Sequence, residues 1–469
     1  MKQVIVVGGG ISGLSTAYLL QRQAKRAGVE INVLLLEKEE RTGGKIWSIR
    51  DRGYLCEWGP NGFLDNKPQT LELCKELKAE GQLLRSNDNA RKRFIYSGSA
   101  LHQLPENGLS FLKSGLISWP GKLRLAMEPF IAKASMGEDE TLADFGRRRL
   151  GGEALDKLIA PMVSGIFAGN PETMSLVSCF PRIAELEKEY GSLIVAMMKL
   201  AKKKKQDVAA GKVVSSAAGP GGVLTSFKDG IQTLTDILTF VVGEGNVRTG
   251  QEVLKVIKGA SSPYRVITSD GELEADAVVM AAPAYATAEM LSKLDTFLGH
   301  SLSQIPYASM TVACFGYERR RIAQDLSGFG YLIPKGEKKN TLGTLWDSSI
   351  FQNRAPAGKV LLRSMLGGAC FPKLIGISDL DVTQRVQDDL KTIMGIKGDP
   401  EFVRIFRHPQ AIPQYVVGHG DRVAHIWDKL GEYPGLVLTG NSYRGIGLND
   451  CIAAAHRASG EVMAYLKNR

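Results

Sequence analysis

The sequence has few of the residues that hold metal ions or form disulfides. None of its six cysteines belongs to a CxxC pair, and none of its six histidines belongs to an HxxxH or HExxH pattern. Zinc and iron–sulfur sites are built on such spacings. We therefore expect reduced thiols, as in a cytoplasmic protein, and no bound metal.

Long hydrophobic runs are also missing. No stretch of 18 uninterrupted apolar residues occurs among the 469, which argues against a membrane-spanning helix. The apolar N-terminus is better explained as a buried strand than as a signal peptide, because three consecutive glycines follow it. We expect no organellar presequence before that strand.

The chain is basic, with a formal net charge of +10, but its Lys and Arg residues are spread along the sequence. No nucleic-acid-binding module can be recognised, so we expect no nucleic-acid partner. A basic surface still attracts an anionic small substrate or acidic lipid headgroups through its overall field.

Glycine is plentiful and is concentrated at one informative place. The run Val4 to Val7 predicts a buried parallel strand, and a helix is expected from Ile11 to about Gln23. The turn between them has the GxGxxG spacing, whose glycines let the backbone approach a pyrophosphate at the start of a helix. The predicted cofactor-binding residues of this turn are Gly8, Gly9, Gly10, Ile11, Ser12 and Gly13.

A second strand is expected at Ile31 to Leu36, at the distance that a βαβ unit requires. Glu37 stands at its carboxyl end, 24 residues after Gly13, where an acid accepts hydrogen bonds from ribose hydroxyls and disfavours a 2′-phosphate. Lys38 follows and is included in the predicted site. The two strands indicate an adenine dinucleotide, although a glycine-rich turn alone can be purely structural.

The continuation Arg41-Thr42-Gly43-Gly44-Lys45 resembles the RxGG(R/K) extension of the amine oxidase-like flavoprotein superfamily. The segment Glu57-Trp58-Gly59-Pro60-Asn61 is similar to that superfamily's E-x-G-P segment, which passes close to the isoalloxazine. The resemblance implies that the cofactor is FAD. It places these further residues in the cofactor site: Arg41, Gly43, Gly44, Lys45, Trp58, Gly59, Pro60 and Asn61.

A second glycine-rich segment lies near the C-terminus and also precedes a predicted helix, which starts near Asn449. Backbone N–H groups at such a helix start can point at a flavin or a diphosphate. The alternative is a glycine-rich cap without function. The predicted cofactor-binding residues here are Gly440, Ile446, Gly447 and Leu448.

The order of the predicted elements favours the α/β class (α+β overall), with a Rossmann-type FAD-binding domain assembled from residues 1–65, 222–295 and 403–469. A discontinuous substrate-binding domain is expected from 66–90 and 296–402, and a helical domain from 91–205. Residues 206–221 are rich in small residues without periodicity and predict a flexible linker.

Nearly the whole chain resembles the oxygen-dependent protoporphyrinogen and coproporphyrinogen oxidase family. The phrases that carry this resemblance include SGIFAGN, GFGYLIP and IPQYVVGH. It implies substrate contacts at Gly165, Ile166, Phe329, Leu332 and Met365, and cofactor contacts at Val253 and His408. From sequence pattern alone, Val253, Leu332 and Met365 would be assigned to the core. An arginine that some relatives place shortly after an LP dipeptide is missing after Leu104-Pro105, so propionate recognition is unassigned.

The resemblance implies a six-electron oxidation of a porphyrinogen by FAD and molecular oxygen, with release of hydrogen peroxide and no catalytic side chain. Coproporphyrinogen III is favoured and protoporphyrinogen IX stays open. The alternatives are an amine oxidase, a phytoene desaturase and a flavin-free binding protein like the GDP-dissociation inhibitors. The stretch 109–133 mixes apolar and basic residues and predicts either peripheral membrane contact or a substrate-lining helical pair. The oligomeric state is left open.

Overall fold

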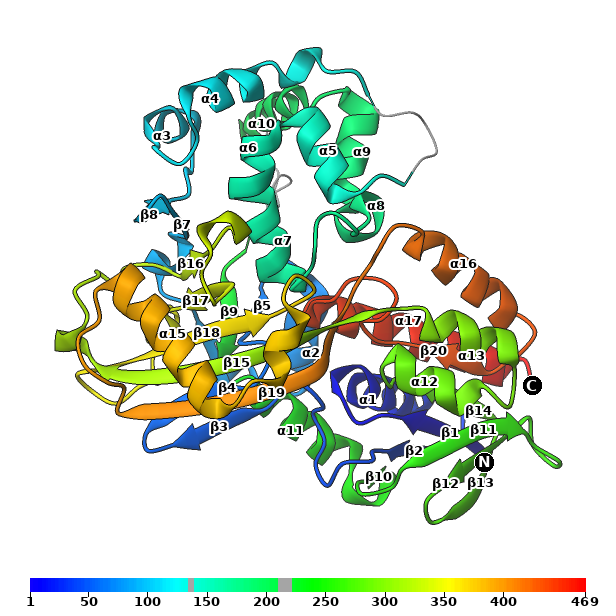
Figure 1. Ribbon diagram of the computed structural model, residues 1–469. Coiled ribbons are helices and arrows are strands. Elements are labelled where there is room, and N and C mark those ends of the chain that lie inside the picture. Colours follow the sequence, from blue (N-terminus) through cyan, green and yellow to red (C-terminus); the bar gives the residue numbers. More distant parts are fainter. Residues whose placement is uncertain (134–138, 210–221) are drawn as a thin grey trace.

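The computed structural model describes residues 1–133, 139–209 and 222–469. Figure 1 shows three parts: a parallel sheet with its helices at the lower right, an antiparallel sheet at the lower left, and a group of helices above both. Among the described residues, no helix combines the length and apolar character needed to cross a membrane.

The parallel sheet has five strands in the order β10-β2-β1-β14-β20. Strand β1 pairs with β2 on one side and with β14 on the other, so that Val4 lies between Val33 and Ala277. The chain reaches this sheet from three distant segments. The strands are β1 (Lys2–Val7), β2 (Ile31–Leu36), β10 (Val247–Arg248), β14 (Ala277–Met280) and β20 (Leu436–Leu438).

Both faces of the sheet are covered, which explains why the side chains on both faces of its strands are apolar. Val4 and Val6 pack against α1 (Ile11–Ala27), α11 (Gln232–Val242) and α17 (Leu448–Lys467). Ile5 and Val7 pack with the antiparallel strands β11 (Val253–Lys258), β12 (Tyr264–Thr268) and β13 (Gly271–Ala275). The same side holds α12 (Ala284–Leu291), α13 (Thr296–Ser303) and α16 (His419–Leu430). The predicted α/β class with a Rossmann-type sheet is confirmed.

The second large sheet has seven strands in the order β19-β15-β18-β17-β16-β7-β8, all antiparallel except the pair β16 and β7. Helix α15 (Asp379–Met394) covers one face, and the hairpin of β3 (Ser48–Asp51) and β4 (Tyr54–Glu57) packs on the other. The strands are β7 (Phe94–Ser97), β8 (Ala100–Gln103), β15 (Tyr307–Glu318), β16 (Gly330–Leu332), β17 (Gly343–Leu345), β18 (Lys359–Gly367) and β19 (Phe402–Pro413).

The helical part stands on the edge of these sheets, and α7 runs from it down toward them in Figure 1. It has an apolar core and also a buried ion cluster, in which Arg149 lies between Glu128 and Glu187. Its helices are α3 (Gly108–Lys113), α4 (Trp119–Ala126), α5 (Leu142–Arg149), α6 (Gly152–Ala154), α7 (Ala160–Phe167), α8 (Leu176–Cys179), α9 (Pro181–Tyr190) and α10 (Leu193–Ala209).

Short elements join the parts. Strands β5 (Phe63–Leu64), β9 (Leu224–Phe227) and β6 (Leu83–Arg85) form a small sheet in that order. Helix α2 (Pro68–Glu76) lies beside it, and α14 (Asp347–Ile350) precedes β18. A π-helical turn, Leu155–Ile159, separates α6 from α7.

Four of the expected domain boundaries differ from the structure. Strands β7 and β8 fall in the range 91–205 that was predicted to be helical, but they extend the seven-stranded sheet. Strand β19, in the range predicted for the FAD-binding domain, pairs with β15 instead. Leu73 and Cys74 of α2, in the range 66–90, pack in the core of the parallel sheet. Helix α10 continues through 206–209, and the rest of the predicted linker, 210–221, lies outside the described residues.

Candidate active site

The turn between β1 and α1 is compact enough to exclude side chains. Gly8 has a positive φ of 105°, and a Cβ placed on Gly13 would lie 1.9 Å from the Gly8 carbonyl oxygen. Gly10 is different, because a Cβ there would meet nothing within 4 Å. Gly10 is also the N-cap of α1 and offers no side-chain acceptor to the first turn, which includes Ile11 and Ser12. The turn is closed toward the protein and open on one side.

Glu37 lies next to this turn, at the end of β2, and is buried. One of its oxygens accepts a hydrogen bond of 2.6 Å from the Gly9 N–H, and the other accepts one of 3.0 Å from the Glu39 N–H. The structure thus brings Glu37 to the glycine turn as expected. Lys38 is not brought there, since its side chain is exposed and forms only an ion pair of 3.7 Å with Glu39.

The RTGGK loop packs directly on the glycine turn. The Gly43 N–H donates a 2.8 Å hydrogen bond to the Gly9 carbonyl, and a Cβ on Gly44 would lie 3.3 Å from the Gly10 Cα. Arg41 folds back on its own loop, where it donates to the Gly44 carbonyl at 2.9 Å and its guanidinium lies 4.2 Å from the Trp47 ring centre. Desolvation by burial lowers the pKa of Arg41.

Lys45 and His408 join this loop to the end of strand β19. The Lys45 ammonium donates to the Gln410 carbonyl at 2.7 Å, and burial lowers the pKa of Lys45 to about 8. The His408 Nε2 lies 2.9 Å from the Trp58 carbonyl oxygen, and burial lowers the pKa of His408. Because Trp58 also packs on the His408 ring at 4.9 Å, the EWGP segment and β19 meet at one point.

The E-W-G-P-N segment is held tightly at its middle. A Cβ on Gly59 would lie 2.4 Å from the Lys45 carbonyl oxygen, so the segment runs against the RTGGK loop. Pro60 beside it is exposed, whereas the amide nitrogen of Asn61 is buried without a hydrogen-bond partner among the described residues.

The C-terminal glycine segment reaches the same turn from the opposite side. Gly440 has a φ of 115°, and a Cβ on it would lie 3.9 Å from the Ser12 Oγ. Gly447 caps α17, whose first residue Leu448 is buried against the parallel sheet. Ile446 packs instead on the helical part. The loop therefore links the glycine turn with the helices above it.

These residues fit an adenine dinucleotide. The open space at Gly10 and the uncapped start of α1 form a cradle for a diphosphate. Ser15 Oγ and Thr439 Oγ1, like the Asn61 amide, are buried without partners among the described residues, and such groups need a hydrogen bond. Val253 is a core residue on β11, as its sequence pattern alone predicts, and Gln251 near it donates its N–H to the Glu37 carbonyl at 2.9 Å.

Two of the predicted substrate residues, Leu332 and Met365, lie on one face of the seven-stranded sheet. Leu332, Gly343 and Met365 are directly opposite one another on β16, β17 and β18, so they share a face. A Cβ on Gly165 would lie 2.8 Å from the Leu332 Cδ2, which places the end of α7 against this face. Ile166, next to Gly165, is exposed.

Phe329 is not brought into the same cluster as Leu332. Phe329 packs with Ala90 and Phe351, whereas Leu332 packs with residues of β7 and the loop before α4. The sequence analysis also assigned no role to Arg93, whose guanidinium lies 5.3 Å from the Phe329 ring centre. No ion pair joins Arg93 to another described residue, and desolvation lowers its pKa. In the sequence Arg93 is one of three consecutive cations, with Arg91 and Lys92, just before strand β7, and nothing there distinguishes it from its neighbours.

A buried ion network was also missed. Arg363 of β18 pairs with Asp347 at 2.9 Å and donates to the Gly59 carbonyl at 2.7 Å. Arg354 lies 3.6 Å from the Glu57 carboxylate. All four charged side chains are buried, and burial raises the pKa values of Asp347 and Glu57. The network fixes the EWGP segment to the seven-stranded sheet.

Further evidence comes from known proteins. Residues 11–463 match the family described as flavin containing amine oxidoreductase. The coproporphyrinogen III oxidase of Bacillus subtilis (strain 168) is 31% identical over 99% of this chain and 98% of its own length. The chloroplastic protoporphyrinogen oxidase of Oryza sativa subsp. japonica is 32% identical over 98% of this chain and 88% of its own. A solved structure from Exiguobacterium sp. 255-15 is 26% identical over 99% of both chains, with a TM-score of 0.82.

The family match spans nearly the whole chain, and the curated relatives align with it over almost their full lengths. Among the described residues, no group of His, Cys, Asp and Glu side chains is arranged to hold a metal ion. The glycine cradle, the loop against it and these matches agree: the chain is an FAD-dependent oxidoreductase and belongs to the flavin containing amine oxidoreductase family.

Proposed function

We propose that this enzyme oxidises a porphyrinogen to the porphyrin with molecular oxygen, and that coproporphyrinogen III is its preferred substrate. The observation that carries the proposal is the free carbonyl of Gly165 near the C-terminal end of α7. The Ala168 N–H binds the Ser164 carbonyl, and no described donor reaches that of Gly165. Gly165 itself adjoins the apolar Leu332–Gly343–Met365 face, since a Cβ on it would lie 2.8 Å from the Leu332 Cδ2, and we propose that its carbonyl accepts a pyrrole N–H there.

The cofactor and the protein chain have different roles in the proposed reaction. When bound, FAD would supply the hydride acceptor and the route of the electrons to oxygen. The chain orients the ring through the apolar face of the sheet, where Gly343 lies between Leu332 and Met365 and a Cβ on it would lie 3.0 Å from the Leu332 Cδ2. The cofactor contacts in this proposal are those predicted from the sequence, with Gly8, Gly10 and Gly13 at the diphosphate and Trp58 and His408 near the isoalloxazine.

Arg93 is the candidate for holding a substrate propionate. It is an exposed cation without a counter-ion among the described residues, and its guanidinium lies over the Phe329 ring. A guanidinium in this state gains a charge-assisted, bidentate hydrogen bond when a carboxylate arrives. We expect Arg93→Ala to raise KM for the porphyrinogen at least tenfold with little change in kcat, and Arg93→Lys to restore part of the loss. Unchanged KM in both variants would remove this role.

The exposed apolar residues of α4 and of the turn that follows it support peripheral association with a membrane. Trp119, Leu123, Met127 and Phe130 follow one another at helical spacing and are all exposed, with Trp119 at 71% and Phe130 at 85%. Large apolar side chains at this spacing on a surface favour a lipid interface. We propose that this ridge touches the membrane while the catalytic parts stay in the aqueous phase.

Steady-state kinetics with coproporphyrinogen III and protoporphyrinogen IX, followed by porphyrin fluorescence, test the substrate. We expect turnover of both, with the higher kcat/KM for coproporphyrinogen III, and about three oxygen molecules consumed per porphyrin formed. Turnover of an amine without turnover of a porphyrinogen would overturn the proposal. Purified protein without a flavin absorbance band would instead favour a flavin-free binding protein.

A further inference from the structure

Strand β19 forms one edge of the seven-stranded sheet and leaves part of its backbone unpaired. The Arg319 N–H donates to the Gly358 carbonyl and the Gly368 N–H donates to the Ser309 carbonyl, so odd-numbered residues of β15 bond toward β18. Alternation along the strand then directs the even-numbered residues of β15 toward β19. Their partners on β19 are Phe402, Arg404, Phe406 and His408.

The intervening residues Val403, Ile405 and Arg407 therefore direct their N–H and C=O groups away from β15. None of these six backbone groups has a hydrogen-bond partner among the described residues. Pro409 interrupts the donors further along the strand. The open edge thus runs from Val403 to Arg407, and its free N–H and C=O groups can pair with another strand.

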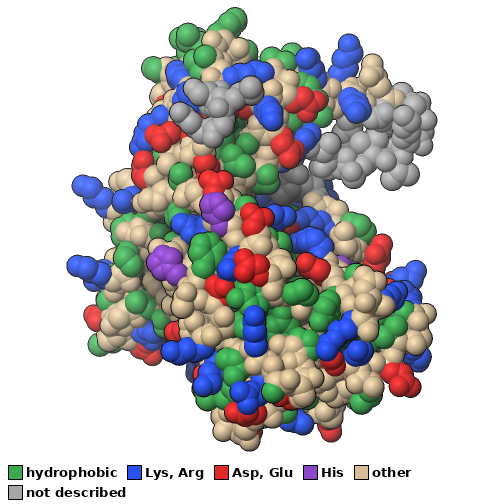
Figure 2. All heavy atoms as spheres, turned by 90° about the vertical axis from the view of Figure 1, so that its right-hand side faces the viewer, with side chains coloured by type: hydrophobic (Ala, Val, Ile, Leu, Met, Phe, Trp, Pro, Cys, Tyr) green, Lys and Arg blue, Asp and Glu red, His purple; other side chains and the backbone are tan. Residues whose placement is uncertain are grey.

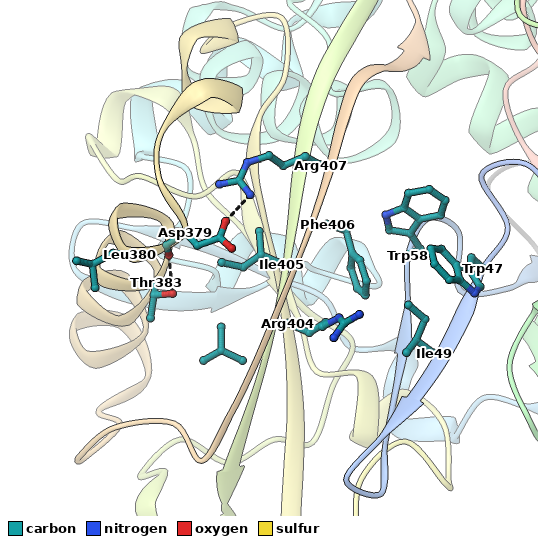
Figure 3. A pocket seen from close by; sticks show the side chains of 11 residues that line it. Trp47, Ile49, Trp58, Asp379, Leu380, Thr383, Arg404, Ile405, Phe406 and Arg407 are labelled. Atoms are coloured by element: carbon teal, nitrogen blue, oxygen red, sulfur yellow. Dashed lines mark hydrogen bonds and ion pairs between the residues drawn. The ribbon is translucent and has the colours of Figure 1, made fainter. Parts of the chain in front are cut away.

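A groove of about 710 Å³ lies along this edge rather than on one side of it. Figure 3 shows Trp47, Ile49 and Phe406 on one side of β19, and Leu380 and Thr383 of α15 on the other. Consecutive residues of β19, from Val403 to Arg407, form its floor. A groove with a wall on each side of a free strand edge can hold an added strand. The side chains of that strand would point alternately to one wall and to the other.

The charges in the groove indicate what such a strand would carry. Arg407 is neutralised by its ion pair with Asp379. Arg404 is exposed on the side of Trp47 and Phe406, and no ion pair or hydrogen bond joins its side chain to another described residue. The opposite wall carries the highly exposed Leu380 beside Thr383 and the ion-paired Asp379. The complementary occupant has acidic side chains toward Arg404 and apolar ones toward Leu380.

A second copy of this chain fits less well. Pairing two β19 edges about Ile405 would bring both unpaired Arg404 side chains onto the same face, in addition to the repulsion between two chains of net charge +10. The expected cofactor contacts begin at His408, beyond this stretch, and of the groove-lining residues only Trp58 belongs to the proposed cofactor site.

We infer that the free edge of β19 between Phe402 and Arg407 is a docking site for an extended segment of another protein, in which acidic and apolar residues alternate. The segment adds a strand to the seven-stranded sheet, with main-chain hydrogen bonds at Val403, Ile405 and Arg407 and an ion pair at Arg404.

Fluorescence anisotropy with a labelled heptapeptide that alternates valine and glutamate tests this inference on the FAD-loaded enzyme. We expect saturable binding, at least tenfold weaker binding of the matching valine–lysine peptide, and a reversed preference in Arg404→Glu. Ile405→Pro removes an outward N–H, which an edge strand tolerates, and is expected to weaken binding at least tenfold. Circular dichroism and flavin absorbance check that each variant is folded.

Leu380→Glu provides a second variant, because Leu380 is a highly exposed residue on the groove wall and its replacement does not disturb the strand. It should weaken binding of the valine–glutamate peptide. Absence of binding, or equal binding of both peptides to all variants, would overturn the inference. Concentration-dependent dimerisation abolished by Ile405→Pro would overturn it in favour of a second copy as the occupant.

Discussion

Single glycines decide whether the nucleotide can approach the chain. Gly13 and Gly10 stand three residues apart in one turn, yet they are needed for different reasons. At Gly13 a methyl group collides with the Gly8 carbonyl within the protein itself, whereas at Gly10 it meets only open space. The first glycine is therefore required by the turn, whereas the second would be required by the diphosphate of the proposed cofactor site.

We expect Gly13→Ala to abolish retention of FAD and to lower stability, because the Cβ would lie 1.9 Å from the Gly8 carbonyl oxygen. Gly10→Ala should weaken FAD binding while leaving the stability of the apoprotein nearly unchanged. Flavin absorbance per protein and thermal unfolding of apoprotein measure the two effects. Gly460→Ala is the matched control: it lies in helix α17 with nothing within 4 Å of the new Cβ, and should stabilise by roughly 0.5–1 kcal/mol. Equal flavin loss in Gly13→Ala and Gly460→Ala would contradict the argument.

His419 is a residue whose ionisation affects the whole C-terminal loop. Its Nε2 donates to the Tyr443 carbonyl at 2.9 Å, its ring stacks on Tyr415 at 4.2 Å, and burial lowers its pKa to about 4. In the unfolded chain a histidine titrates near 6.5. Between these pH values the unfolded state binds more protons, so the free energy of unfolding falls as the pH is lowered.

We expect the titration of His419 to lower the free energy of unfolding by about 3 kcal/mol once it is complete. The loss develops as the pH falls from about 6.5 to about 4. His419→Gln, which keeps an N–H donor but does not titrate, should flatten the fall of the melting temperature over that range. His425→Gln, an exposed histidine on the same helix, should leave the profile unchanged. A profile of His419→Gln that parallels the native one would show that other groups control the acid transition.

At the scale of elements, the buried ion network is what ties β18 to the EWGP segment. Arg363 holds the Gly59 carbonyl and Asp347 together, and both charged side chains are buried. Removing one member of a buried pair leaves the other charge uncompensated, at a cost of about 3–5 kcal/mol. The network therefore has a positioning role, because it fixes the path of the segment beside Trp58.

We expect Arg363→Met to lose about 3–5 kcal/mol of unfolding free energy and to release FAD faster, since the Gly59 carbonyl loses its donor. The double variant Arg363→Met with Asp347→Leu should be more stable than Arg363→Met alone. Urea unfolding and the rate of flavin dissociation measure both effects. If the double variant loses as much unfolding free energy as the two single variants together, the two residues do not stabilise the protein through their ion pair.

Elements also show where prediction from the sequence succeeded. The first strand, the glycine turn and the second strand depend on local spacing, and the structure has them where the sequence analysis expected them. The pairing of β7 with β16 and of β19 with β15 depends on contacts between residues far apart in the sequence, which no local pattern reveals. The same applies to Arg363, whose charge was visible in an apolar strand but whose partners Asp347 and Gly59 come from elsewhere in the chain.

At the scale of the whole molecule, the apolar ridge lies on the helical part, away from the parallel sheet that forms the nucleotide site in Figure 1. On the face drawn in Figure 2, Lys and Arg side chains are scattered among acidic and apolar ones rather than gathered into one patch. Charge alone therefore provides no clear docking face there, and the apolar ridge is the feature that would orient the enzyme on a lipid surface.

We expect the double variant Trp119→Ser with Phe130→Ser to bind liposomes of phosphatidylglycerol and phosphatidylcholine at least tenfold more weakly in a sedimentation assay. Both side chains are more than two-thirds exposed, so folding and flavin content should not change. Each removes a large apolar surface from contact with lipid, and the overall basic charge stays the same. Phe240→Ser is the matched control, since Phe240 is 82% exposed on α11 beside the parallel sheet. If the ridge variant binds as well as Phe240→Ser, the exposed residues of α4 have another purpose, and lining the path of the substrate becomes the better explanation.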